Sequence, residues 1–308
     1  MKHLLKLLDC STEEILSILD MADQLKYENK HNITHHHLAG KSLGMIFEKS
    51  STRTRVSFET GIYQLGGQPL FLSSRDLQIG RGEPVEDTAR TLSRYVHGLL
   101  IRTYAQDEVE TLAKCASIPV INGMTDFCHP CQVLADLMTI REKFAQLEGL
   151  KLCFIGDGHD NVANSLMVGG LKVGMEVAVA SPSTHQPYPE VMDFVNGEIA
   201  KGAKFTLTED VYEAAKNADV VFTDVWTSTG HEDMREENRR QLAGYQVNHE
   251  LLEVCKPEVM VQHCLPAVRG EEITAEVFEE HADEIFEEAE NRLHAQKAVM
   301  VKLMGEQD

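Results

Sequence analysis

The chain has 308 residues, 43% of them hydrophobic, and a formal net charge of −20. Its length and composition are those of a globular protein with room for two domains of roughly 150 residues each. The acidic charge repels polyanions, which excludes general binding to nucleic acid or to an anionic membrane and requires any anion site to be a local cationic pocket.

The seven cysteines are odd in number and widely spaced, unlike the dense, even sets of secreted disulfide-rich domains. We therefore expect free thiols and a cytoplasmic protein. The opening stretch MKHLLKLL is followed by Asp9, Glu13 and Glu14, which come too early for the apolar core of a secretory signal. No run approaches the roughly 18 apolar residues that a membrane span needs.

The first predicted element is a helix that opens at Ser11, because Glu14 follows three residues later, as in a capping box. Four strand-like apolar runs come next, separated by segments of helix length, at 42–48, 68–73, 97–103 and 117–122. After a helical stretch at 131–144, a second series of runs lies at 151–156, 176–181, 204–208, 218–225 and 258–265. A last helix, over about 283–304, has no strand after it.

Strands that alternate with helices imply parallel sheets. We therefore predict an α/β fold with two doubly wound parallel-sheet domains joined by interdomain helices. Residues 1–145 form the first domain, residues 146–290 form the second, and residues 291–308 form a C-terminal helix that packs back on the first domain.

Polar residues gather where the predicted strands end, and ligands of open α/β sheets bind at these carboxyl ends. In chain order these positions hold Ser51 to Arg55, Arg102, His129 with Gln132, Asn161, Asp224 with Ser228, and His263 to Pro266. We therefore take these positions as the candidate site.

The stretch STRTR, residues 51–55, begins a predicted helix directly after a strand. In the first turn of a helix the backbone N–H groups lack partners and the dipole is positive, so added hydroxyl and guanidinium groups make a phosphate site. The alternative is an N-cap serine followed by surface arginines in ion pairs. Arg55 points away from Arg53 and is expected to be structural. The glycine and lysine spacing of a P-loop is missing.

Arg292 falls on the apolar stripe that Ile285, Ala289, Val299 and Leu303 form on the last helix. A charge on a buried face needs an anionic partner. The alternative is that its long side chain reaches solvent.

Four motifs stand in the order found in one enzyme family: STRTR after a strand, HPCQ at 129–132, DVWTSTG at 224–230 and HCLP at 263–266. Over nearly the whole chain they resemble the aspartate/ornithine carbamoyltransferase family, and HCLP and the DxWxSxG loop resemble its ornithine branch. The resemblance implies transfer of a carbamoyl group from carbamoyl phosphate to the δ-amine of L-ornithine, without cofactor or metal. It suggests a place in arginine biosynthesis, but a catabolic direction stays open. It also implies a homotrimer with shared active sites.

The resemblance assigns the carbamoyl phosphate site to the first half of the chain and to two later segments. Ser51, Thr52, Arg53 and Thr54 would hold the phosphate, and Arg102 would reach the phosphate and the carbonyl oxygen. His129 would donate to that oxygen and Gln132 would accept from the carbamoyl NH₂. The remaining contacts would come from Arg292, from the backbone carbonyl of Leu265 beside a cis Leu-Pro bond, and from Gln78 of a neighbouring subunit.

The resemblance assigns the ornithine site to Asn161, Asp224, Ser228 and the residue after it. That residue is Thr229, where the family usually has methionine, so substrate preference is open at this position. Beside Asp224, a Cys264 thiolate would orient the δ-ammonium and help to take its proton. The alternatives are a turn-capping role for Asp224 and a small buried hydrophobe for Cys264.

Four other interpretations of the motifs compete with this function. Cys128, His129 and Cys131 suggest zinc, but adjacent residues rarely aim at one ion and no second ligand pair follows. Gly156 and Gly158 suggest a dinucleotide site, but the third glycine is Asn161. A carbamoyltransferase for a related amine such as putrescine, or a non-catalytic family member that binds small molecules, stays open.

Overall fold

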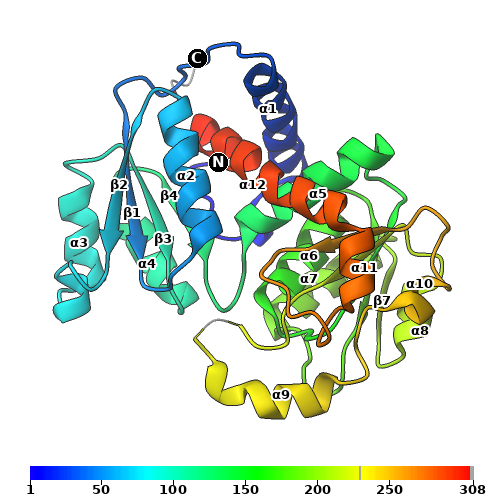
Figure 1. Cartoon of the computed structure of the whole chain (residues 1–308). Coiled ribbons are helices and arrows are strands. Elements are labelled where there is room, and N and C mark those ends of the chain that lie inside the picture. The colour runs from blue at the N-terminus through cyan, green and yellow to red at the C-terminus, as the bar shows by residue number, and fades with distance from the viewer. Residues whose placement is uncertain (229, 306–308) are drawn as a thin grey trace. The chain divides into compact units, whose positions relative to one another are not determined.

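The structure, a computed structural model, describes residues 1–228 and 230–305 (Figure 1). It divides into two compact units. The first contains Met1–Ala135 and the C-terminal segment that begins at Asn291, and the second contains Asp136–Glu290. The division falls inside the helix α5 (Pro130–Phe144), ten residues before the boundary suggested by the sequence.

The first unit is built on a four-stranded parallel sheet. Its strands, in the spatial order β2-β1-β3-β4, are β2 (Gln68–Ser73), β1 (Ser42–Phe47), β3 (Gly98–Arg102) and β4 (Val120–Met124). The chain reverses its direction of winding between β1 and β3. Their register pairs Phe47 with Arg102, so both strands end at the same level and their carboxyl ends are neighbours.

The two edge strands of this sheet differ in burial. All five residues of the inner strand β3 and of the edge strand β4 are buried, whereas the other edge strand, β2, is half-exposed. Leu4 covers the outer edge of β4, because it exchanges backbone hydrogen bonds of 2.9 and 2.8 Å with Val120 and Asn122. The continuous apolar run GLLIR forms an inner strand because helices cover both of its faces.

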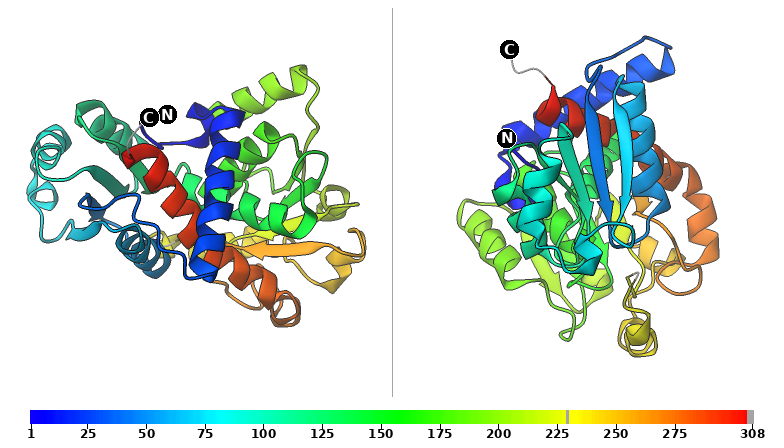
Figure 2. Two further views of the ribbon diagram at one scale, coloured as in Figure 1. Left: turned by 90° about the horizontal axis from the view of Figure 1, so that it is seen from above. Right: turned by 90° about the vertical axis from the view of Figure 1, so that its left-hand side faces the viewer.

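Helices cover the two faces of the first sheet. On one face, α3 (Val85–Leu92) and α4 (Gln106–Cys115) pack against a core that includes Ile46, Ile101 and Val120. On the other lie α2 (Thr52–Gln64), α1 (Thr12–Lys30) and the end of α12 (Ala282–Met304), and Figure 2 shows α1 and α12 crossing. The fully buried Phe58 of α2 contributes about 2 kcal/mol to this packing. The short helices η1 (Leu7–Asp9) and η2 (Ile79–Arg81) lie in connections.

The second unit is built on a five-stranded parallel sheet in the order β7-β6-β5-β8-β9. The strands are β5 (Lys151–Ile155), β6 (Glu176–Ala180), β7 (Phe205–Thr208), β8 (Val220–Thr223) and β9 (Met260–His263). Winding reverses between β5 and β8, and β8 pairs with β9 so that Thr223 lies beside His263. The carboxyl ends of β5, β8 and β9 therefore form one row.

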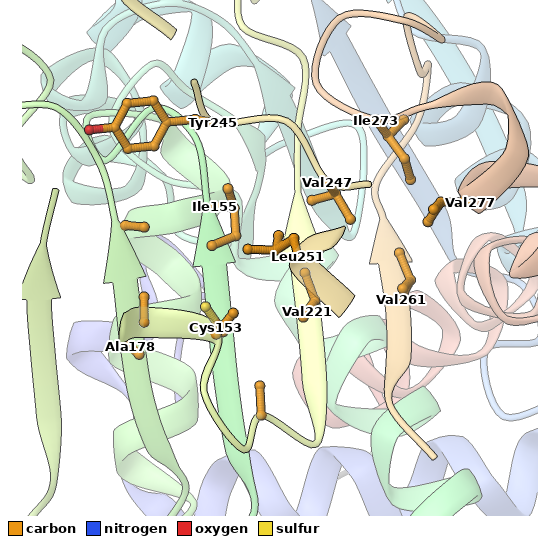
Figure 3. Packing of buried hydrophobic residues seen from close by; sticks show 14 of the residues in the cluster. Cys153, Ile155, Ala178, Val221, Tyr245, Val247, Leu251, Val261, Ile273 and Val277 are labelled. Carbon is orange, nitrogen blue, oxygen red and sulfur yellow. The ribbon is translucent and has the colours of Figure 1, made fainter. Parts of the chain in front are cut away.

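One face of this sheet carries the apolar cluster drawn in Figure 3, which includes Cys153, Val221, Val261 and Val277. The helices on this unit are α6 (Asn161–Lys172), α7 (Pro189–Ala200), α8 (Val211–Ala215), α9 (Arg235–Leu242), α10 (His249–Leu252), α11 (Ala275–Glu280) and the short η3 (Glu232–Met234). α6 packs on the opposite face, where Gly170 lies against Val177 and Leu152.

The predicted α/β fold with two parallel sheets is confirmed, and each strand in the described part of the chain overlaps a predicted run. The capping box of Ser11 and Glu14 is present at the start of α1. Within 1–228 and 230–305, no helix combines the length and the apolar character that crossing a membrane takes. The C-terminal segment predicted over 291–308 is helical to Met304, and its last three residues lie outside the described part.

Candidate active site

The stretch STRT caps helix α2 at the carboxyl end of β1. The side-chain oxygen of Ser51 accepts a hydrogen bond of 3.1 Å from the backbone N–H of Thr54, which makes Ser51 the N-cap. Thr52 and Arg53 form the first turn, where backbone N–H groups point out of the helix. The end of β1 thus presents a positive helix terminus, as the sequence predicted.

Two further arginines converge on Thr54 from other elements. Arg102, at the end of β3, donates from Nη1 to the Thr54 hydroxyl at 3.5 Å. Arg292, on α12, donates from Nη2 to the same hydroxyl at 3.2 Å, and its Nη1 donates to the Gln132 side-chain oxygen at 2.5 Å. These four side chains are at most 7% exposed, so their charges act in a medium of low dielectric constant.

His129 lies in the field of these arginines. Burial lowers its pKa well below the usual value, and the charges of Arg292, Arg102 and Arg53 lower it further. His129 is therefore a neutral imidazole near neutral pH, in which one ring nitrogen carries a proton and is a donor. A buried neutral donor beside guanidinium groups suits a carbonyl that gains negative charge.

Four other residues considered for this half of the site lie at the surface or are buried thiols. Arg55 is exposed, pairs with Glu59 at 3.0 Å and stacks 3.6 Å from the ring centre of Phe71, which agrees with the structural role expected for it. Gln78 is exposed in the loop before η2, and its role at a neighbouring subunit stays a prediction. Burial raises the pKa of the thiols of Cys128 and Cys131 to about 12, which disfavours the thiolate form that binds zinc.

In the second unit, Asn161 is the first residue of α6 and Asp160 is its N-cap. One carboxylate oxygen of Asp160 accepts from the backbone N–H of Val162 at 2.7 Å, and the other accepts from the Ser228 hydroxyl at 3.4 Å. The end of β5 and the loop after β8 therefore meet at this carboxylate. Gly158 is required by packing, because a Cβ there would lie 2.6 Å from the carbonyl oxygen of His185.

Asp224 and Cys264 follow the neighbouring strands β8 and β9. Burial raises the pKa of Asp224 well above its usual value, and the negative charge of Asp160 raises it further. Burial likewise raises the pKa of Cys264, as do the charge and the hydrogen bond of Asp224. The surroundings favour a neutral thiol at Cys264, whereas the sequence suggested a thiolate. No ion pair among the residues that the structure describes neutralises Asp160 or Asp224. Two such buried carboxyl groups form a site that attracts an ammonium group.

His263 fixes the loop that carries Cys264 and Leu265. Its Nδ1 accepts from the backbone N–H of Leu265 at 2.9 Å, so its proton is on Nε2, which donates to Glu272 at 3.0 Å. The Leu265–Pro266 bond is cis, as the resemblance implied. Ligand atoms of Asp224, His263 and Cys264 lie within 4.8 Å of one another, but both ring nitrogens of His263 are engaged. A metal ion there would have to break one of these bonds.

Four residues that contact the predicted site residues were not predicted from the sequence: Ser57, Asp160, Glu272 and Gln296. Asp160 could have been predicted, because it directly precedes Asn161 and aspartate is a typical N-cap residue at the start of a helix. Glu272 and Gln296 gave no signal, because their partners are distant in sequence or in other elements. Thr229, predicted to contact ornithine, lies outside the described residues.

Comparisons with known proteins match the chain in two parts. A family model described as "Aspartate/ornithine carbamoyltransferase, carbamoyl-P binding domain" matches residues 2–142, and one described as the "Asp/Orn binding domain" of the same family matches residues 148–303.

Similar proteins match over almost their full length. The ornithine carbamoyltransferase of Oceanobacillus iheyensis is 52% identical over 99% of this chain and 95% of its own, and that of Methanosarcina acetivorans is 53% identical over 98% and 99%. The solved structure of the Pyrococcus furiosus ornithine carbamoyltransferase superposes with a TM-score of 0.94 at 48% identity and covers 100% of this chain and 98% of that one. The chain therefore belongs to the aspartate/ornithine carbamoyltransferase family.

Proposed function

We propose that this chain transfers the carbamoyl group of carbamoyl phosphate to the δ-amine of L-ornithine, giving L-citrulline and phosphate. The observation that carries the proposal is the convergence of Arg102 and Arg292 on Thr54, beside a neutral His129, in a member of this family. Two buried cationic side chains therefore meet in a chain of net charge −20.

The phosphate of carbamoyl phosphate binds at the first turn of α2. Ser51, Thr52 and Thr54 supply hydroxyl and backbone donors, and Arg53 with Arg102 supplies guanidinium forks. The phosphate is also the leaving group. Its developing charge is met by the same donors, so they assist the departure as well as the binding.

The carbamoyl group binds beside the phosphate. Arg292 and the N–H of neutral His129 point donors at the carbonyl oxygen, and Gln132 accepts from the carbamoyl NH₂. The backbone carbonyl of Leu265 is a second acceptor for that NH₂. When the amine attacks the carbonyl carbon, the oxygen becomes negative, and fixed donors stabilise it without reorganisation. The C–O bond to phosphate then breaks, and the departing phosphate takes the proton that the attacking nitrogen loses.

Ornithine binds in the second unit. Its α-amino and α-carboxylate groups are held by Asn161, Asp224 and Ser228, and Thr229 borders its methylenes. The δ-ammonium has to give a proton to solvent before the amine attacks, because a free alkylamine has a pKa of about 10.4. A neutral Cys264 thiol accepts from that amine and donates to Asp224, so the pair orients the nitrogen lone pair. Positioning of the two ligands then supplies most of the rate.

Three finer assignments belong to the same proposal. The enzyme works as a homotrimer in which Gln78 reaches a neighbouring active site. It acts in the cytoplasm, which the free thiols of all seven cysteines within the described ranges support. Its citrulline enters arginine biosynthesis.

The test is a citrulline assay with purified protein, carbamoyl phosphate and a panel of amines: ornithine, putrescine, lysine and acetylated ornithine. We expect turnover with ornithine and at least tenfold lower kcat/KM with the others. Higher kcat/KM with putrescine would move the assignment to that amine. Absence of any carbamoylated product, together with tight binding of carbamoyl phosphate, would make the chain a non-catalytic family member.

A further inference from the structure

Gln296 lies one helical turn after Arg292 on α12, so the two side chains share a face of the helix. Both are buried, with Gln296 fully inaccessible to solvent and Arg292 3% exposed. Across from them, on α2, lie Ser57 and Thr54. Ser57 and Gln296 were not part of the site expected from the sequence.

The chemistry of the guanidinium fixes how the Gln296 amide is turned. A guanidinium only donates, so the Gln296 atom that faces it has to be the carbonyl oxygen. In that orientation the oxygen accepts from Arg292 Nη2 at 2.8 Å and from Nε at 2.9 Å, and the amide nitrogen donates to the Ser57 hydroxyl at 2.5 Å. Ser57 in turn donates to the backbone carbonyl of Arg53 at 2.5 Å.

These bonds form one directed chain from α2 to α12. It runs from the carbonyl of Arg53, through Ser57 and Gln296, to one edge of the Arg292 guanidinium. Nη2, which faces Gln296, also donates to Thr54, and Nη1 donates to Gln132. Bonds on more than one edge fix the plane of the guanidinium and not just its position.

We propose that Gln296, supported by Ser57, is a positioning residue that holds Arg292 in the plane needed to meet the carbamoyl carbonyl. This rests on the proposed function, in which Arg292 contacts the carbamoyl group. Gln296 is neutral, so it orients the guanidinium without cancelling the positive charge that the substrate requires. A displacement of about 1 Å at such a donor is enough to cost a large part of the rate.

The chain offers a matched control. Gln64 of α2 accepts from Lys297 of α12 at 2.9 Å and also links these two helices, but it does not contact Arg292 in any described bond. Gln296→Met and Gln64→Met each remove one amide that links α2 to α12. Only the first releases Arg292.

The experiment measures binding of two probes by calorimetry. Inorganic phosphate occupies the start of α2 alone, whereas phosphonoacetamide also carries a carbamoyl-like amide. For Gln296→Met we expect the Kd of phosphonoacetamide to rise about tenfold and that of phosphate to change less than twofold. The KM for ornithine should stay within twofold. For Gln64→Met we expect both Kd values within twofold of the original protein at a similar loss of Tm.

A double-mutant cycle tests the chain of bonds. Ser57→Ala alone should raise the Kd of phosphonoacetamide about threefold, and Gln296→Met with Ser57→Ala should match Gln296→Met alone. The proposal is overturned if Gln296→Met binds both probes as Gln64→Met does, if it loses phosphate and phosphonoacetamide equally, or if the original protein does not bind phosphonoacetamide. If Gln296→Met loses affinity for phosphonoacetamide but not for phosphate, and the original protein forms no citrulline, the proposed function is refuted while the positioning role of Gln296 is supported.

Discussion

His263 and Glu272 form a fully buried pair in which Nε2 of the imidazole lies 3.0 Å from a carboxylate oxygen. The same oxygen accepts from the backbone N–H of Val268 at 2.6 Å, and His263 Nδ1 accepts from Leu265. The acidic side chain thereby fixes the tautomer of His263, and His263 fixes the loop after β9.

Glu272→Ala should leave the His263 ring and the Val268 N–H without a buried acceptor. We expect a loss of about 2–4 kcal/mol in the free energy of unfolding and a lower kcat. Glu272→Gln keeps one oxygen in place and should stay within about 1.5 kcal/mol. Urea denaturation and steady-state rates measure both effects. An alanine variant as stable as the original protein would contradict the role of this pair.

Asp160 should make recognition of an α-ammonium group depend on pH. Burial raises the pKa of this carboxyl to about 7, and the charge of Asp157 adds to that shift. Below pH 7 Asp160 is protonated and neutral, so it attracts a cation weakly, and above pH 7 it is ionised. The affinity for L-norvaline, an α-amino acid without a δ-amine, should therefore rise by about tenfold, or about 1.4 kcal/mol, as the pH passes through 7.

Asp160→Asn should abolish this inflection, since an amide does not ionise. Calorimetric titration of norvaline between pH 5.5 and 8.5 makes the comparison. A pH profile that is unchanged by the substitution would assign the titration to another group.

Lys297 should weaken the fold when it is charged. Its side chain is fully buried, with Nζ 2.6 Å from Nε2 of His35, and burial lowers its pKa from 10.5 to about 8. Below pH 8 it is protonated in both the folded and the unfolded state. Between pH 8 and 10.5 the unfolded chain binds more protons than the folded one, so the contribution of Lys297 to stability rises with pH.

Lys297→Met removes this titration. The free energy of unfolding of the original protein, minus that of the variant, should therefore increase from pH 8 to 10 by at most about 1.4 kcal/mol per pH unit. Denaturation of both proteins at several pH values gives this difference. A difference that is flat, or that falls with pH, would show that Lys297 does not have a lowered pKa.

The strands could be predicted from the sequence because parallel strands covered on both faces are continuous apolar runs, such as KLCFI in β5. The places where site residues gather could be predicted for a related reason: Arg102, Asp224 and His263 follow such runs, and strand ends are ligand sites in this class of fold. Their detailed roles came from the family resemblance.

What the sequence could not supply are the contacts between distant segments. Ser57 and Gln296 are 239 residues apart, and neither has a local pattern that differs from an ordinary helix residue. The ionisation state of Cys264 was equally hidden, because its raised pKa comes from burial and from the carboxyl groups of Asp224 and Asp160 on other segments of the chain. The division inside α5 also leaves no composition signal, since that helix is buried along most of its length.

The proposed function depends on the first turn of α2 holding carbamoyl phosphate for transfer. Arg53 and Arg55, two residues apart, allow a matched comparison of two alanine variants. Arg53→Ala removes a guanidinium of the proposed site, worth about 1.5–3 kcal/mol, whereas Arg55→Ala removes one that pairs with Glu59 at the surface.

The most direct measurement is the dependence of citrulline formation on the concentration of carbamoyl phosphate for these two variants beside the original protein. We predict that Arg53→Ala raises the KM for carbamoyl phosphate by roughly 10- to 150-fold with an unchanged Tm, while Arg55→Ala stays within about twofold, as expected for a surface pair. Equal kinetic constants for all three proteins would contradict the account.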